Sequence, residues 1–417
     1  MTKRLVIVSH VFPPAQHANA KRPYLMAKYL VRRGWDVTVL TSAFQMAGRP
    51  VRDIDGIHVA CVPAWSVNWI ERLHPWPRVR AKLMALLQGL LPPDLFAPWI
   101  RQVAKRLRTI DYERAILNVL PYAGYELAQA NVIDGRWIID FQESIYPFLK
   151  EYGRTSPVQR WYLPRFFALE EKVLDACGGV WFTSDANRRR YIEEGRVEAS
   201  KTAYLPYFYD PELYPERTVH AEPQSADWVM VYGGHLDATW RSPRTFFAAW
   251  AQLRKENPQA AAALVLHVYG RLTPDCQEMA KYYGVHDRIL VKKQVPYTDF
   301  LAVAQHADML LFIDAAGQEL FNPGKLADFF GAHRPVVAFT AEGSEVHAML
   351  ASVGMEEYTC ARDDVAGGTA ALVRLWQQRR AGTPTLNFDT KRYAVQTVCK
   401  EAEQHLLLSG PRQPSAM

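Results

Sequence analysis

One lysine lies where the start of a predicted helix would present it to an anion. The sequence Asn322-Pro323-Gly324-Lys325 follows a continuous apolar run at 309–313. Asparagine is a favoured N-cap and proline suits the first helical position, so we expect a helix to begin at Pro323 or Gly324. Exposed backbone N–H groups and the positive end of the helix dipole make such a terminus an anion site. Lys325 adds a full charge, which points to a phosphate-bearing ligand.

Asp328 lies one turn further into the same predicted helix. Residues three apart share a helix face, so its carboxylate and Lys325 would meet one ligand from the same side. A carboxylate there suits the hydroxyl groups of a sugar attached to the bound phosphate. The alternative interpretation is an ordinary capped helix with a solvated lysine, because most helix N-termini bind nothing.

Two earlier loops have related chemistry. Gly233-Gly234-His235 follows an apolar run at 229–232, with Arg241 close behind. Two glycines allow a ligand to approach the backbone, where His235 and Arg241 would reach a phosphate. Gly270 and Arg271 follow a second apolar run at 264–269, and Arg271 fits a cleft-facing role and a solvated or helix-capping role equally well.

The elements that would position these residues are parallel strands alternating with helices. In the first half, an apolar run at 5–8, a helix with apolar spacing of 3.6 at 22–33, Gly34 as its C-cap and a run at 37–40 predict a parallel βαβ unit. Continuous apolar strands indicate a sheet covered on both faces. Further predicted elements of this half are strands at 57–62, 115–119, 137–140 and 180–183 and a helix at 158–176.

The same alternation restarts after residues 209–227, a segment without periodicity that is rich in Pro and Glu. The elements predicted there are strands at 229–232, 264–269, 289–291, 309–313 and 336–339 and helices at 244–255, 274–283 and 297–305. We therefore predict an α/β protein with two Rossmann-like, doubly wound domains facing a cleft. The predicted divisions are an N-terminal domain at 1–208, a linker at 209–227, a C-terminal domain at 228–390 and a final helix with a frayed tail at 391–417. We expect this final helix to pack back on the N-terminal domain.

Length and composition agree with this organisation. The chain has 417 residues, 49% of them hydrophobic and 22% charged, which is globular and more than one ordinary core requires. A net charge of +6 suits anionic partners, but the absence of zinc-ligand spacing or an RNA-binding aromatic strand argues against nucleic acid. Five single cysteines without a Cys-x-x-Cys pair indicate neither a disulfide framework nor a metal site.

The segment 65–108 interleaves tryptophans with arginines and lysines and contains few acids. On amphipathic helices this composition is typical of a peripheral membrane contact. Packed helices with a solvated basic face account for it equally well. No stretch reaches the roughly 20 apolar residues of a membrane-spanning helix, and the N-terminal apolar run is too short for a signal peptide. We expect a cytoplasmic protein, with the inner face of the membrane as its contact surface.

Several motifs in order along the chain resemble the GT-B glycosyltransferases, and in particular the large bacterial family 4. The opening Ser9-His10-Val11-Phe12-Pro13-Pro14 with Arg22, and then the segment at 34–41, is similar to the start of that family's acceptor domain. The later similar segments are Ile139-Asp140-Phe141-Gln142-Glu143, Val180 to Ser184, Leu205-Pro206-Tyr207, Asn322 to Leu326 with Asp328, and Pro335 to Ala338.

This resemblance implies a metal-independent hexosyltransferase in cell-envelope glycan synthesis. It would move a sugar from a nucleoside diphosphate to a lipid-linked or polysaccharide acceptor, with retention and without a cofactor. Arg241, Lys325 and the N–H groups at Gly324 would stabilise the leaving diphosphate, with His235 assisting when protonated. The remaining donor-side residues of the resemblance are Gly233, Gly234, Arg271, Asn322, Pro323, Leu326 and Asp328. Its acceptor-side residues are His17, Asn19, Arg22, Asp140 and Glu143, and Glu319, His17 and Asp140 are the candidates for the base.

The chain also departs from the family pattern. Asp328 stands at the second of two glutamates that the family often carries, and the first falls on Leu320, beside Glu319. His235 and Arg241 replace the family's phosphate-binding Arg and Lys. The segment 15–20 replaces the glycine-rich first loop, and no histidine occurs near 118–125. Two other functions therefore stay open: a sugar-nucleotide epimerase on the same fold, and a degenerate transferase that binds without turnover.

Overall fold

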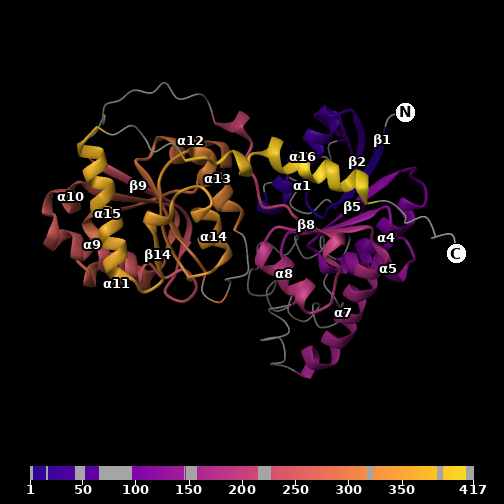
Figure 1. Cartoon of the computed structure of the whole chain (residues 1–417), viewed down its shortest axis with the longest axis horizontal. Helices are drawn as coiled ribbons and strands as arrows, with labels where there is room; N and C mark the ends of the chain where they lie inside the picture. Colours follow the sequence, from indigo (N-terminus) through magenta and orange to yellow (C-terminus); the bar gives the residue numbers. More distant parts are fainter. Residues whose placement is uncertain are drawn as a thin grey trace. The chain divides into compact units, whose positions relative to one another are not determined.

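The structure is a computed structural model that describes residues 3–15, 17–42, 52–64, 96–144, 146, 157–214, 227–315, 317, 323–382 and 388–409 (Figure 1). The chain forms two compact units, one of Met1–Pro206 with Val395–Met417 and the other of Tyr207–Ala394. The predicted linker start at 209 lies inside the second unit, where the Tyr209 N–H donates to the Tyr393 carbonyl at 3.0 Å. Each unit is described by itself.

The first unit contains an eight-stranded sheet in the order β3-β4-β2-β1-β5-β6-β7-β8. All its neighbouring strands run parallel except the short pair β3 and β4. Strand β1 lies between β2 and β5, so the chain reverses its direction of winding there, which is where open sheets of this kind bind ligands. The strands are β1 (Lys3–Val8), β2 (Trp35–Thr41), β3 (Asp53–Ile54), β4 (Ile57–Cys61), β5 (Arg114–Val119), β6 (Trp137–Phe141), β7 (Gly179–Phe182) and β8 (Thr202–Tyr204).

Helices of the first unit pack against this sheet. In helix α4, Trp99, Ile100 and Val103 are fully buried while its arginines and lysine face outward. Trp99 is thus a core residue and not part of a membrane-facing surface. The helices are α1 (Ala18–Arg32), α4 (Ala97–Leu107), α5 (Glu126–Gln129), α7 (Pro157–Ala176), α8 (Asp185–Glu193) and α16 (Val395–Leu408), with single 3-10 turns at Tyr122–Tyr125 and Ala199–Lys201.

The last helix belongs to the first unit although the second unit precedes it in sequence. Helix α16 lies alongside α1, as Figure 1 shows. Glu403 on α16 accepts hydrogen bonds from Trp35 Nε1 at 2.9 Å and Arg33 Nε at 3.2 Å, and His405 Nδ1 accepts one from Trp181 Nε1 at 3.0 Å. These polar contacts fix the helix in one register on the unit.

The second unit contains a six-stranded, fully parallel sheet in the order β11-β10-β9-β12-β13-β14. Strand β9 lies between β10 and β12 and marks the reversal of winding in this unit. The strands are β9 (Trp228–Leu236), β10 (Leu264–Leu272), β11 (Ile289–Lys292), β12 (Met309–Ile313), β13 (Val336–Thr340) and β14 (Thr359–Ala361).

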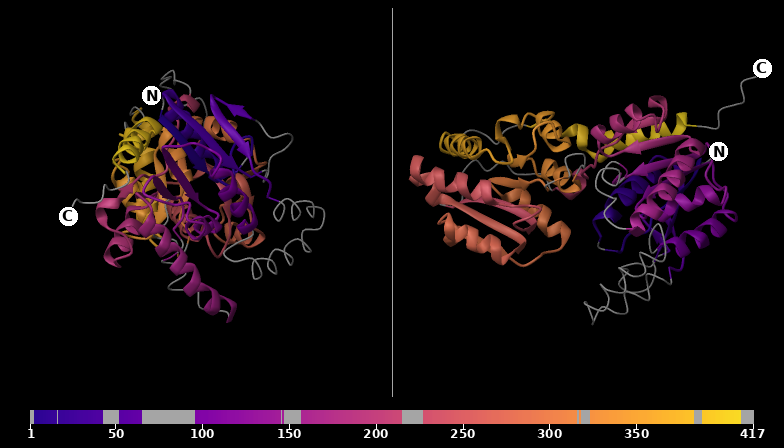
Figure 2. Two further views of the ribbon diagram at one scale, coloured as in Figure 1. Left: turned by 90° about the vertical axis from the view of Figure 1, so that its right-hand side faces the viewer. Right: turned by 90° about the horizontal axis from the view of Figure 1, so that it is seen from below.

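Helices cover both faces of this second sheet, as the right-hand view of Figure 2 shows. The apolar core between sheet and helices includes Trp228, Phe247, Trp250, Phe329 and Val337, all almost completely buried. The helices are α9 (Arg244–Glu256), α10 (Pro258–Ala263), α11 (Pro274–Tyr282), α12 (Tyr297–His306), α13 (Gly324–Ala332), α14 (Glu345–Ala351) and α15 (Val365–Arg380), with 3-10 turns at Pro211–Leu213, His286–Arg288, Glu356–Tyr358 and Lys391–Tyr393.

The predicted fold class is confirmed, because both sheets are parallel, apart from the short pair β3 and β4, and carry helices on their faces. Strands β9 and β10 run on past their predicted ends to Leu236 and Leu272, which places the predicted glycine loops inside the strands. In the part of the chain that the structure describes, no helix has the length and apolar composition that crossing a membrane requires.

Candidate functional site

The candidate site in the second unit begins at two glycines that face each other across β9 and β10. Gly234 pairs with Gly270, and their φ angles of +125° and +148° favour glycine. A Cβ on Gly270 would lie 2.1 Å from the Gly234 carbonyl oxygen, so the strands can approach this closely only without side chains.

The space above the β9 glycines is filled by other side chains of the protein. A Cβ on Gly233 would lie 2.3 Å from the Phe300 ring, and one on Gly234 would lie 3.0 Å from Lys325 Nζ. This corrects the prediction that both glycines leave room for a ligand. Gly233 accommodates Phe300, whereas Gly234 allows the lysine ammonium to lie against the strand.

Lys325 is the second residue of α13, and its ammonium lies 4.7 Å from the centre of the Tyr232 ring. The pKa of Lys325 is lowered to about 7, mainly by burial and also by the nearby charge of Arg241, while Asp328 acts in the opposite direction. The lysine is therefore only partly charged near neutral pH. An anion placed beside it would favour the charged form and raise its pKa again.

Arg241 is held near Lys325 by a closed loop that follows β9. Asp237 Oδ1 accepts the backbone N–H groups of Thr239 at 2.9 Å and Trp240 at 2.6 Å. The Asp237 N–H in turn donates to the Arg241 carbonyl at 3.4 Å. Such a turn, built on an aspartate side chain, fixes where the arginine enters the site.

Asp328 is anchored at both its side chain and its backbone by tyrosines. The Tyr297 hydroxyl donates to Asp328 Oδ1 at 2.7 Å, and the Tyr214 hydroxyl donates to the Asp328 carbonyl at 2.8 Å. Burial raises the pKa of the Tyr297 hydroxyl and the carboxylate of Asp328 raises it further, so the hydroxyl stays a donor. The structure thus brings Lys325, Arg241 and Asp328 into one cluster with mixed charge.

Other predicted donor-side residues lie near this cluster or outside what is described. His235 and Arg271 are exposed and stand opposite each other in the register of β9 and β10. Helix α13 begins at Gly324 with Pro323 in the cap position, where no side chain caps it. Asn322 and Glu319 lie outside the described residues.

Leu326 is the clear correction on the donor side. Its side chain is completely buried in the core of the second unit, so it does not face a ligand. The cause is helical phase, because residues 325 and 328 share one face whereas Leu326 shares the opposite face with Phe329 and Phe330. Leu326 anchors the helix whose other face carries the charged groups.

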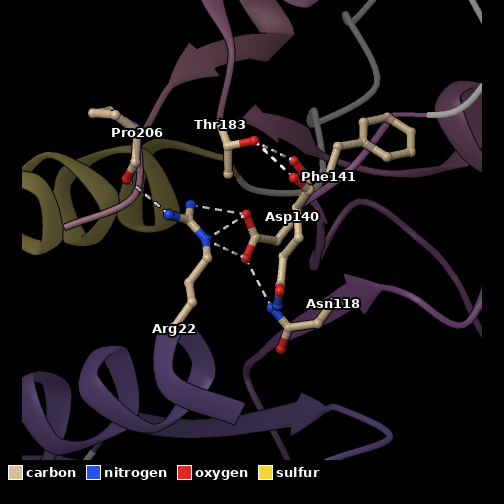
Figure 3. A network of polar contacts seen from close by, with 7 residues as sticks. Arg22, Asn118, Asp140, Phe141, Thr183 and Pro206 are labelled. Carbon is tan, nitrogen blue, oxygen red and sulfur yellow. Dashed lines mark hydrogen bonds and ion pairs between the residues drawn. The ribbon is translucent and has the colours of Figure 1, made fainter. Parts of the chain in front are cut away.

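The predicted acceptor-side residues Arg22 and Asp140 form a buried ion pair, drawn in Figure 3. The exposed fractions are 2% for Arg22 and 0% for Asp140. Arg22 Nε and Nη2 each donate to the carboxylate at 2.9 Å, Arg22 Nη1 donates to the Pro206 carbonyl at 2.9 Å, and Asn118 Nδ2 donates to Asp140 Oδ2 at 2.7 Å.

This network corrects the predicted roles of both residues. The Asp140 carboxylate already accepts from a guanidinium and an amide, which makes it a poor general base. The pair instead ties α1 to β6 and to the chain that leaves β8. Arg22 and Asp140 are positioning residues of the first unit.

The remaining acceptor-side residues lie at the start of α1 and after β6. His17 Nδ1 accepts the Asn19 backbone N–H at 3.2 Å, so the histidine caps α1. Burial lowers the pKa of His17, which keeps the ring neutral and able to accept this bond. His10 packs 6.1 Å from His17 between ring centres, and burial lowers its pKa to about 4. Glu143 is exposed in the turn after β6, and Asn19 is half-buried in the first turn of α1.

Sequence reasoning missed the residues that orient the donor-side cluster. Tyr297 and Tyr214 reach Asp328 from 31 and 114 positions away. A second network, at the ends of β12 and β13, was also missed: Thr340 Oγ1 donates to Asp314 Oδ2 at 2.8 Å, and Arg362 Nη2 donates to the Ala315 carbonyl at 2.8 Å. The only signal in the sequence was that Tyr297 and Asp314 lie at predicted element ends.

Solved structures with a GT-B-like fold match this chain over almost its full length. The chain is similar to a sucrose-phosphate synthase from Thermosynechococcus elongatus, with a TM-score of 0.63, 15% identity and coverage of 96% of this chain and 98% of that one. It is also similar to a trehalose-6-phosphate protein from E. coli bound with UDP-2-fluoro glucose, with a TM-score of 0.60, 13% identity and coverage of 97% and 99%.

A third similar structure is WaaG, a glycosyltransferase involved in lipopolysaccharide biosynthesis. Its TM-score is 0.60 at 13% identity, with coverage of 95% of this chain and 99% of that one. No protein-family model and no curated protein matches the sequence. At these identities the similarity shows the fold over the full length of the chain and does not show the chemistry. The chemistry therefore depends on this chain's own residues.

Proposed function

We propose that this protein is a glycosyltransferase that moves a sugar from a nucleoside diphosphate to an acceptor hydroxyl. The observation that carries the proposal is the cluster of Lys325, Arg241 and Asp328 beside the start of α13. It supplies two cations and a helix N-terminus for a diphosphate, and a carboxylate suited to sugar hydroxyls. One similar structure is bound with UDP-2-fluoro glucose, and another belongs to a trehalose-6-phosphate synthase that transfers a glycosyl group with retention. Both support a nucleotide-sugar donor for this chain.

The chemical demand on such a site is negative charge on the leaving group. The bond between the sugar's anomeric carbon and the diphosphate oxygen breaks, the acceptor oxygen takes its place, and the acceptor's proton goes to a base. Lys325, Arg241 and the α13 N–H groups would stabilise the departing diphosphate. Losing one such contact in a site shielded from water costs about 2–4 kcal/mol of transition-state stabilisation.

The type of acceptor and the cellular location are proposed from one similar structure and one helix face. One similar structure belongs to a glycosyltransferase of lipopolysaccharide biosynthesis, which supports an envelope glycan or a lipid-linked acceptor. The basic outward face of α4, with Arg101, Lys105 and Arg106, supports a peripheral contact with an anionic membrane surface. We place this contact at the cytoplasmic face, where sugar nucleotides would be available.

Release of nucleoside diphosphate from a panel of UDP-, GDP- and ADP-sugars tests the proposal. We expect turnover with one nucleotide class, with water or an added acceptor taking the sugar. Lys325→Ala should reduce the rate about 10²- to 10³-fold. Lys255→Ala, an exposed lysine on α9, is the matched control and should leave the rate unchanged.

The outcomes also separate the alternatives. A donor that binds at Lys325 without any turnover would show a degenerate transferase. Conversion of the sugar nucleotide into its epimer, with the nucleotide retained, would show an epimerase.

A further inference from the structure

A cavity of about 1000 Å³ lies in the first unit, between strand β4 and the C-terminal half of helix α4. One wall is the strand and the residues after it, from Val59 to Pro63, and is almost wholly apolar. The opposite wall carries Gln102, Lys105, Arg106 and Thr109, and Arg52 lies beside the strand, where its carbonyl accepts the Val59 N–H. None of the predicted acceptor-side residues lines this cavity.

The cations of this cavity are not neutralised within the described chain. Arg52, Lys105 and Arg106 form no ion pair with any described residue, and no described lining residue is acidic. Arg101, on the same helix but outside the cavity, behaves differently, because its Nε lies 3.3 Å from Glu126 Oε2. Three uncompensated cations beside an apolar wall fit a ligand that has an anionic head and an apolar tail.

We propose that this cavity binds an anionic amphiphile, a lipid phosphate, as a site separate from the donor cluster. Its head group would lie among Arg52, Lys105 and Arg106, and the first part of its chain would lie along residues 59–63. A bare anion would leave the apolar wall without a partner, and a neutral amphiphile would leave the three charges unmatched. The inference does not depend on the transfer reaction.

A natural reporter stands in the apolar wall. Cys61 is half-buried and lines the cavity, whereas Cys177, Cys276, Cys360 and Cys399 are buried. Burial raises the pKa of the Cys61 thiol, so labelling with a maleimide is best followed at about pH 8.5. Cys61→Ser identifies the labelled site.

The test measures how strongly three probes protect Cys61 in the full-length protein: dodecyl phosphate below its micelle concentration, inorganic phosphate, and dodecyl maltoside. We expect protection by dodecyl phosphate alone. The double variant Lys105→Ala/Arg106→Ala should weaken this protection about tenfold or more, because it removes two of the three cations that would contact the head group. The control variant Arg101→Ala/Arg108→Ala removes the same amount of charge outside the cavity. In this variant, dodecyl phosphate should protect Cys61 as strongly as in the wild type.

Each other outcome overturns the proposal. If inorganic phosphate protects Cys61 as well as dodecyl phosphate does, the cavity binds anions without using its apolar wall. If dodecyl maltoside protects equally well, the three cations do not contribute to binding. No protection by any probe would show that the cavity does not take an amphiphile. Flotation with phosphatidylcholine vesicles, with and without phosphatidylglycerol, then separates a bilayer lipid from a free amphiphile: protection of Cys61 by anionic vesicles identifies the bilayer as the source.

Discussion

The proposed role of Lys325 would couple ligand binding to the uptake of a proton. Its pKa of about 7 without ligand means that the amine is largely neutral at pH 8. A diphosphate favours the ammonium, so binding above pH 7 takes up a proton, and affinity should fall up to tenfold per pH unit as pH rises above 7. Calorimetry in buffers of different ionisation enthalpy measures this uptake directly.

Lys325→Arg is the matched control, because arginine stays charged throughout this range. The same loss of affinity with pH in that variant would show that another group titrates. For folding, the unfolded chain keeps the lysine proton up to its ordinary pKa of 10.5. The Lys325 contribution to stability therefore rises with pH between about 7 and 10.5.

Asp328 is expected to contact a ribose hydroxyl, with Tyr297 orienting its carboxylate. Replacing the nucleotide by its 2′-deoxy form should weaken binding to the wild type but not to Asp328→Ala. Tyr297→Phe removes one neutral-to-charged hydrogen bond and should weaken binding by about 1.5–3 kcal/mol at most. Titration of both nucleotides against the three proteins checks this. An equal penalty for the deoxy form in Asp328→Ala would place the ribose elsewhere.

Residues of the donor-side cluster could be predicted where their neighbours lie close to them in the sequence. Lys325 and Asp328 share a helix face by spacing alone, and the structure has them together. Tyr297 could not be predicted, because its contact with Asp328 joins α12 to α13 through tertiary packing. The predicted donor-binding role of Leu326 was wrong, because every residue of the family motif was assigned to the site. The position of Leu326 on the helix already indicated that its side chain faces the core.

At the scale of elements, the buried pair of Arg22 and Asp140 joins α1, β5 and β6. Arg22→Met leaves a buried carboxylate without its cation and should lower the free energy of unfolding by about 3–5 kcal/mol. The double variant Arg22→Met/Asp140→Leu should recover much of that loss, because both charges are gone. Urea unfolding of the three proteins measures it. A single-variant loss below 1 kcal/mol would contradict this role for the pair.

Most of the longer elements could be predicted from helical spacing or from continuous apolar runs, but the 16-residue helix α15 was missed. Strand β12 matches its predicted bounds, and β13 exceeds its prediction by only Thr340. The short strands β3, β8 and β14 were missed, because two or three partly exposed residues have no visible alternation. Their strand character comes from pairing with a neighbour that the sequence does not identify.

At the scale of the whole molecule, the two units should respond to different perturbations. Glu403 on α16 accepts from the buried indole of Trp35, so Glu403→Ala should destabilise the first unit by about 1–3 kcal/mol. Glu401→Ala, an exposed change on the same helix, is the control. Scanning calorimetry with a bound nucleotide should shift the transition of the second unit only. A joint shift of both transitions in each experiment would contradict independent units.

The two-sheet organisation could be predicted because the alternation of strands and helices stops and restarts around residue 220. The contacts that hold α16 could not, because an amphipathic helix shows that it has an apolar face but not which residues it meets. Those contacts involve Trp35 and Trp181, which lie far from α16 in the sequence.

The central claim is that the second unit binds a nucleoside diphosphate at Lys325 and Asp328. Thermal unfolding with a panel of nucleoside diphosphates, on the wild type, Lys325→Ala and Asp328→Ala, tests it most directly. At about 100 times Kd, a nucleotide adds about 2.7 kcal/mol of stability. We predict a shift with one nucleotide that both variants weaken. No shift with any nucleotide, or an undiminished shift in both variants, would contradict the account.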